Sequence, residues 1–141
     1  MSIDWTSVNE DTPIFSLESK YLLCKVVDVY DGDSCKVVFP LNEKMYKWNV
    51  RLTGYDTPEM RPPRNQENRD EEIAAAKRAR DYLKSQVMNK NQLVYIKCGG
   101  FDKYGRLLGE LFVNHEDEIS VNQQMIDNNY GYVYHGGTKK V

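Results

Sequence analysis

The sequence is short of cysteine, and this excludes two common ways of stabilising or equipping a small domain. The 141 residues contain three cysteines, Cys24, Cys35 and Cys98, an odd number without the spacing of zinc ligands. This pattern argues against a disulfide framework and against a zinc site. We therefore expect free thiols, buried or neutral, in a reducing compartment.

Long apolar runs are also absent. No stretch approaches the roughly 20 apolar residues that a membrane-spanning helix needs. The first 20 residues are polar and acidic, so no basic segment followed by an apolar run marks a secretory signal. We expect no membrane partner and an intracellular location, either cytoplasmic or nuclear.

An excess of positive charge is missing as well. The 19 lysines and arginines are outnumbered by 21 aspartates and glutamates, which gives a net charge of -2. This balance counts against a protein that holds nucleic acid through a broad basic surface. It leaves open an enzyme that grips one or two phosphates and uses acidic residues to hold a metal ion.

What the sequence does contain is a regular series of strand-like and helix-like segments. Two helices are expected, at 70–88 and at 121–128, the second capped by Ser120 with Gln123. In the first helix, residues at helical spacing form an apolar stripe that we expect to be buried; they are Ala76, Ala79, Leu83 and Val87. Strands are expected at 22–29, 34–39, 46–52, 92–98 and 107–113, with a short extended segment at 130–134.

This order of elements predicts the fold class. It is mainly β with helices (α+β): a five-stranded Greek-key barrel of the OB-fold type, with a helix after the third strand and a short helix near the C-terminus. We expect one domain over residues 21–141. Residues 1–20 form an N-terminal arm that either docks through Trp5, Ile14 and Phe15 or stays loose.

Two acidic motifs follow strands. Asp31-Gly32-Asp33 lies between the first two strands, and Asp56-Thr57-Pro58-Glu59 follows the third. Taken alone, the first is explained by a hairpin turn and the second by a turn or a helix cap. Taken together, Asp33 and Asp56 could share one hard cation such as Ca²⁺, with a carbonyl and waters completing its shell. Glu59 could then hold or deprotonate a water molecule beside the metal.

Two arginines are further candidates for the site: Arg51, five residues before Asp56, and Arg106, in a later turn. Arg51 lies on an apolar strand, where it is either a structural ion-pair partner or a fork for a phosphate. Arg106 closes the turn 102–106 and, taken alone, is explained as a solvated turn residue. As a set, the acids and arginines match the needs of phosphodiester hydrolysis, in which a cation and arginines stabilise the added negative charge.

The ordered blocks resemble a known family. The chain resembles staphylococcal nuclease (thermonuclease) and its relatives in a series of motifs. In chain order they are Asp31-Gly32-Asp33-Ser34, Arg51, Asp56-Thr57-Pro58-Glu59, Asp102-Lys103-Tyr104-Gly105-Arg106 and Tyr130-Gly131-Tyr132-Val133-Tyr134. The resemblance runs from about Leu22 to Tyr134. It implies an OB-fold barrel that hydrolyses DNA and RNA with Ca²⁺ and leaves a 5′-hydroxyl and a 3′-phosphate. Ser34 stands where the family usually has threonine.

The resemblance also implies a role for each motif residue around the metal. Asp33 and Asp56 would be carboxylate ligands of Ca²⁺, and Thr57 would bind it through its carbonyl oxygen. Asp31 would lie just outside the ligands and support them. Glu59 would be the general base or the residue that orients the attacking water. Mn²⁺ and Mg²⁺ are less favoured occupants of the same oxygen site.

The remaining implied roles concern the substrate. Arg51 and Arg106 would grip the phosphate, and Tyr104 and Tyr132 would flank the nucleotide. One alternative is a catalytically inactive barrel of the same fold that binds nucleic acid or a protein. A second alternative is a domain that binds Ca²⁺ for structural reasons only, but that interpretation gives no function to the two arginines. The sequence does not decide the oligomeric state.

Overall fold

Alternating burial along five strands builds the barrel that the sequence predicts. The computed structural model describes residues 2–89 and 91–134. The barrel strands are β1 (Tyr21–Asp31), β2 (Ser34–Leu41), β3 (Lys44–Leu52), β5 (Leu93–Phe101) and β6 (Leu107–Phe112). In β2, for example, Cys35, Val37 and Phe39 point inward and are almost fully buried. Every second residue therefore contributes to the core.

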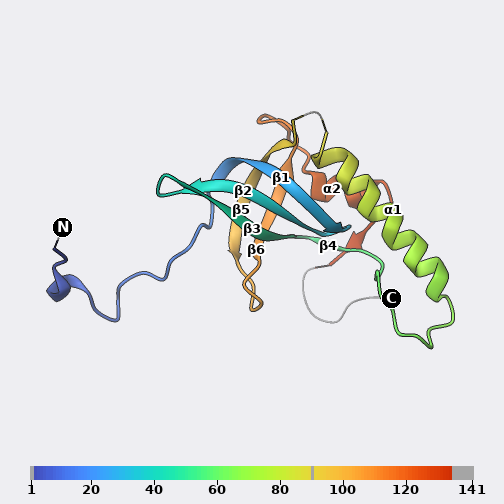
Figure 1. The fold of residues 1–141 in the computed structure, drawn as a ribbon, viewed down its shortest axis with the longest axis horizontal. Coiled ribbons are helices and arrows are strands. Elements are labelled where there is room, and N and C mark those ends of the chain that lie inside the picture. The colour runs from blue at the N-terminus through green and yellow to red at the C-terminus, as the bar shows by residue number, and fades with distance from the viewer. Residues whose placement is uncertain (1, 90, 135–141) are drawn as a thin grey trace.

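The strands close in the order β1-β2-β3-β6-β5, with β5 paired to β1 (Figure 1). All pairs are antiparallel except β3 with β6. This order is that of an OB-fold barrel and confirms the predicted fold class. The parallel pair aligns Arg51 with Leu108 and so brings the turn before β6 to the end of β3.

Two helices and a small second sheet complete the fold. Helix α1 (Arg69–Val87) buries the predicted stripe against the barrel: Ala76, Ala79, Leu83 and Val87. Helix α2 (Val121–Asp127) begins at Ser120, whose side chain accepts a hydrogen bond from the Gln123 amide. Strands β4 (Tyr55–Asp56) and β7 (Tyr132–Val133) pair with each other outside the barrel. In the described part of the chain, no helix is long and apolar enough to span a membrane.

Of the three side chains that the sequence suggested for docking the N-terminal segment, Phe15 lies against the barrel, with its ring centroid 6.4 Å from that of Phe101. Trp5 and Ile14 are 70% and 92% exposed, and the segment runs away from the barrel (Figure 1). Its anchor is Leu17, which is 1% exposed within the core cluster. After it, the Ser19 amide donates to the Cys98 carbonyl, so the chain is already bound to β5 before β1 begins.

The three cysteines are free and buried, as expected. Burial raises the pKa of Cys24 to about 12 and raises the pKa values of Cys35 and Cys98 as well. The thiols are therefore neutral at physiological pH and act as small apolar residues in the core.

The β1–β2 and β2–β3 hairpins use glycine and asparagine in ways that the sequence analysis did not anticipate. The Asp31-Gly32-Asp33 turn exists, but positive φ angles occur instead in the β2–β3 turn, at Asn42 and Glu43. Gly32 is required by close packing. A Cβ atom there would lie 2.8 Å from the Ala79 Cβ and 2.9 Å from the Thr57 Cγ2. The absent side chain lets the turn approach α1.

We therefore predict that Gly32→Ala destabilises the protein by about 1–3 kcal/mol, the usual cost of overpacking a filled site. Gly100→Ala is the matched control, because its nearest new contact is the flexible carboxylate end of exposed Glu18. Urea denaturation of the three proteins measures the difference. Equal midpoints for Gly32→Ala and the unaltered chain would contradict the close packing.

Candidate active site

Three segments far apart in the sequence meet at one end of the barrel. The β1–β2 turn brings Asp33, the end of β3 brings Arg51, and β4 with its following residue brings Asp56 and Thr57. Asp33, Asp56 and Thr57 are only 8%, 7% and 3% exposed. Polar groups this buried need partners, and here they find them in one another and in Arg51.

Arg51 connects the two aspartates. Its Nη1 lies 3.5 Å from Asp33 Oδ2, and its Nη2 lies 3.4 Å from Asp56 Oδ1. The same guanidinium donates to the carbonyls of Leu52 and Tyr55, at 2.6 and 3.0 Å. Arg51 thus has the structural contacts that one reading of the sequence gave it, and they fix both acids at the same place.

Asp31 holds the turn in shape. Its Oδ1 accepts hydrogen bonds from the Asp33 amide at 3.1 Å and from the Ser34 hydroxyl at 2.6 Å. The side chain therefore supports the Asp33 backbone, and its implied place outside the ligands of a metal stays a prediction. Ser34 supplies the hydroxyl for this contact, and a threonine at the same position would carry the same donor group.

Asp33 is in an unfavourable electrostatic position for an isolated carboxylate. Burial and the charge of Asp31 raise its pKa to about 8, although the Arg51 guanidinium opposes the rise. Thr57 contributes two contacts nearby: its hydroxyl donates to Asp33 Oδ2 at 3.3 Å, and its amide donates to Asp56 Oδ1 at 3.1 Å.

The oxygen donors at this point are of the chemical kind that a hard cation prefers. They are the carboxylate oxygens of Asp33 and Asp56, and Thr57 contacts the first through its hydroxyl and the second through its backbone amide in the same buried cluster. Oxygen-only, flexible coordination is what Ca²⁺ accepts. Across residues 2–89 and 91–134, no three His, Cys, Asp or Glu side chains form a complete metal-binding group. A cation here would therefore need a carbonyl and water molecules to complete its shell.

The β5–β6 turn presents the second arginine. Asp102 Oδ2 accepts a 2.7 Å hydrogen bond from Arg106 Nε, and its Oδ1 accepts from the amides of Tyr104 and Arg106. Although burial opposes ionisation, these bonds lower the pKa of Asp102. Gly105 has a φ of 82°, which the tight turn requires. Arg106 is thus held to its own turn through Nε.

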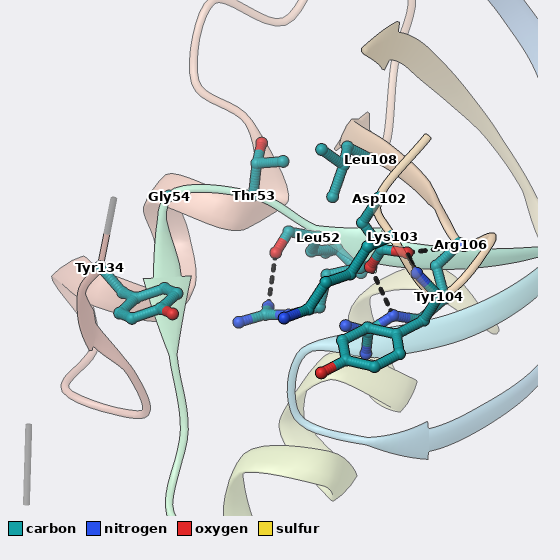
Figure 2. A pocket seen from close by; sticks show the side chains of 10 residues that line it. Leu52, Thr53, Gly54, Asp102, Lys103, Tyr104, Arg106, Leu108 and Tyr134 are labelled. Atoms are coloured by element: carbon teal, nitrogen blue, oxygen red, sulfur yellow. Dashed lines mark hydrogen bonds and ion pairs between the residues drawn. The ribbon is translucent and has the colours of Figure 1, made fainter. Parts of the chain in front are cut away.

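Arg51 and Arg106 line one open pocket of about 460 Å³ (Figure 2). We call it the tyrosine pocket, because Tyr104 and Tyr134 flank it from the β5–β6 turn and from the end of β7. Tyr104 is 72% exposed, and the Lys103 ammonium and the Arg106 guanidinium lie over its ring, 5.2 and 5.4 Å from the ring centroid. Lys103 also lines the pocket. Sequence reasoning assigned Tyr104 to the substrate but assigned no role to Tyr134 or Lys103.

Tyr132 occupies a different position from Tyr104. Its Cα pairs with that of Asp56 across β4 and β7, so it lies beside the acidic cluster. Its role against the nucleotide stays a prediction. The repeated tyrosines at 130, 132 and 134 were the available signal for Tyr134, since alternate strand residues share one face.

Glu59 is exposed and lies on the loop that leads from β4 to α1. Its backbone amide donates a 2.7 Å hydrogen bond to Oε2 of Glu72, in the first turn of α1. Oε1 of Glu72 accepts a second 2.7 Å bond from the Gln66 side chain. Glu72 therefore ties both ends of this loop to the helix, a positioning role that the sequence analysis missed.

We predict that Glu72→Ala loosens this loop without unfolding the barrel. The amide proton of Glu59 should exchange with solvent several-fold faster, because it loses a charge-assisted acceptor. Glu71→Ala, one residue away in the same exposed turn, controls for the loss of negative charge at the helix start. Hydrogen exchange followed by NMR measures both. Equal Glu59 exchange in the two variants would show that Glu72 does not hold the loop.

The sequence is similar to a known protein family and to individual proteins. The model of the family described as staphylococcal nuclease homologue matches residues 49–140. Endonuclease YhcR of Bacillus subtilis is 31% identical over 113 residues, which cover 77% of this chain and 9% of that protein. The uncharacterized protein MJ1439 of Methanocaldococcus jannaschii is 29% identical over 124 residues, covering 78% of this chain and 58% of that protein.

The chain thus spans little more than half of one curated relative and a small part of the other. The family match begins at Asn49, so it includes Arg51, Asp56 and Arg106 and extends past Tyr134. Asp31 and Asp33 precede the matched residues, yet the fold brings Asp33 into contact with Arg51. Because the family model matches more than half of the sequence, this chain belongs to the staphylococcal nuclease homologue family.

Proposed function

We propose that this protein is a Ca²⁺-dependent nuclease that hydrolyses phosphodiester bonds of DNA and RNA and leaves 5′-hydroxyl and 3′-phosphate ends. One observation carries the proposal. Arg51 contacts both buried aspartates and also lines, with Arg106, the pocket that lies open to solvent. A phosphate in that pocket would meet two guanidinium groups next to an oxygen-lined cation site.

The ligands in this proposal are Asp33, Asp56 and the carbonyl of Thr57, with Asp31 supporting them. When bound, Ca²⁺ would neutralise phosphate charge and orient the substrate. Their burial supports such a role, because preorganised groups in a site with little water stabilise charge better than solvent does.

The other residues act on the substrate and the water. Glu59 accepts a proton from the water that attacks phosphorus, and the bond from phosphorus to the 5′ oxygen breaks. Arg51 and Arg106 stabilise the added negative charge, and Arg106 also stabilises the departing oxygen until it takes a proton from solvent. Tyr104 and Tyr132 contact the nucleotide, where aromatic rings can stack on a base.

The alternative is a barrel of the same fold that binds nucleic acid or a protein without cutting. The filled set of acids and arginines favours the enzyme, since a binding domain needs no acids beside its phosphate site. A structural Ca²⁺ domain is less favoured, because Arg106 lies in an open pocket and makes its ion pair through Nε with Asp102 of its own turn.

We predict that the purified chain degrades single-stranded DNA, duplex DNA and RNA when Ca²⁺ is present and loses this activity in a chelator. Readdition of Ca²⁺ should restore it, and mass spectrometry of the products should find 3′-phosphates. Asp33→Asn, purified in parallel, controls for contaminating nucleases. Activity that persists in the chelator, or that never appears at any Ca²⁺ level, would refute the proposal.

We predict that Arg106→Ala and Glu59→Ala each reduce kcat by at least ~100-fold, the usual effect of removing a group that acts in the transition state. Arg78→Ala, an exposed arginine on α1, is the control for a lost positive charge. Circular dichroism melts should show that all variants fold. A loss of only a few-fold in either variant would remove that residue from the proposed mechanism.

A further inference from the structure

A second, smaller hollow begins on the other side of Arg106. It has a volume of about 200 Å³, and Arg106 lines both it and the tyrosine pocket. We call it the strand hollow, because its other lining residues come from β1, β2 and β3. The side chains that the argument uses are Tyr30, Lys36 and Asn49.

The strand hollow continues the site along the outer face of the barrel. Asn49 lies two residues before Arg51 on β3, so both side chains leave the same face of the strand. On β2, Ser34 pairs with Arg51 and Lys36 pairs with Asn49. One step along these two strands therefore leads from the phosphate-binding arginines into the hollow.

The residues of the hollow match one nucleotide. Tyr30 is 60% exposed and offers a ring for stacking on a base. The amide of Asn49 can both donate and accept hydrogen bonds at a base edge. Lys36 and Arg106 supply positive charge for the backbone. Asp28 lies opposite Lys36 across the strands and also lines the hollow, but within the described residues no ion pair joins the two.

We propose that the strand hollow binds the nucleotide on the far side of the cleaved phosphate from the nucleotide in the tyrosine pocket. The proposal rests on the proposed function, since Arg106 must hold the phosphate that joins the two. It makes single-stranded nucleic acid with a base on each side of the cleaved bond the preferred substrate. The protein then reads the strand through two base sites that share one arginine.

Binding tests this without catalysis. The full chain is titrated into fluorescently labelled hexathymidylate at low salt in the presence of a chelator, and anisotropy is recorded. Tyr30→Ala should weaken binding about five-fold or more, the usual range for a lost base stack. Tyr46→Ala, an exposed tyrosine that lines neither pocket, should bind as the unaltered chain does.

Salt dependence tests the role of Lys36. Lys36→Ala should lower the slope of log affinity against log salt by about one, as expected for one lost phosphate contact. Lys77→Ala, exposed on α1, should leave the slope unchanged. If Tyr30→Ala matches Tyr46→Ala and Lys36→Ala matches Lys77→Ala, or if the unaltered chain does not bind, the strand hollow is not a nucleotide site.

Cleavage of dinucleotides locates the base. The substrates are dithymidylate and the two versions with an abasic sugar on one side. Tyr30→Ala should slow cleavage of dithymidylate and of the abasic version that keeps the base bound in the strand hollow. It should not change cleavage of the other abasic version, because that substrate has no base to stack on Tyr30. Equal effects on all three would overturn the assignment while leaving the nuclease intact. Tyr30-dependent binding with no cleavage by the unaltered chain would instead overturn the proposed function alone.

Discussion

The contact between Arg51 and two aspartates is the constraint on which the candidate site depends. The Arg51 side chain is only 13% exposed, and it joins the β1–β2 turn to β4 through Asp33 and Asp56. A partly buried charge cluster of this kind is costly to assemble and costly to break, since removing one member leaves the others without compensation. The fold therefore has to hold three separate segments in place around one guanidinium.

The surrounding structure meets this requirement with rigid apolar packing. Tyr55 is completely buried, and its hydroxyl donates a 2.7 Å hydrogen bond to the Gly32 carbonyl in the turn that carries Asp33. Gly131 lets β7 approach closely, because a Cβ there would lie 2.6 Å from the Tyr55 ring. Together with the packing of α1 against Gly32, these contacts hold the acid-bearing segments in place around Arg51.

The sequence predicted those parts of the structure that depend on local pattern. Alternation in β2 and helical spacing from Ala76 to Val87 determine burial within one element, so the five strands and both helices were predicted correctly. Leu17, the β4–β7 pair and the Glu72 contact to Glu59 were missed, because each depends on contact between distant segments. Gly32 shows the same limit. Glycine is needed there because Ala79 and Thr57 leave no space for a Cβ atom, and a local turn preference does not reveal that contact. The motif residues Asp33, Arg51 and Asp56 do converge, but their chemical roles stay predictions.

Direct measurement of metal binding tests the central claim, that Asp33 and Asp56 form one cation site beside Arg51. Isothermal titration of Ca²⁺ into the full chain at neutral pH should give one binding event. Asp33→Asn and Asp56→Asn should each abolish it, whereas Asp102→Asn, in the β5–β6 turn, should retain it. Absence of Ca²⁺ binding to the unaltered chain, or binding that survives in the Asp33→Asn and Asp56→Asn double variant, would contradict the account.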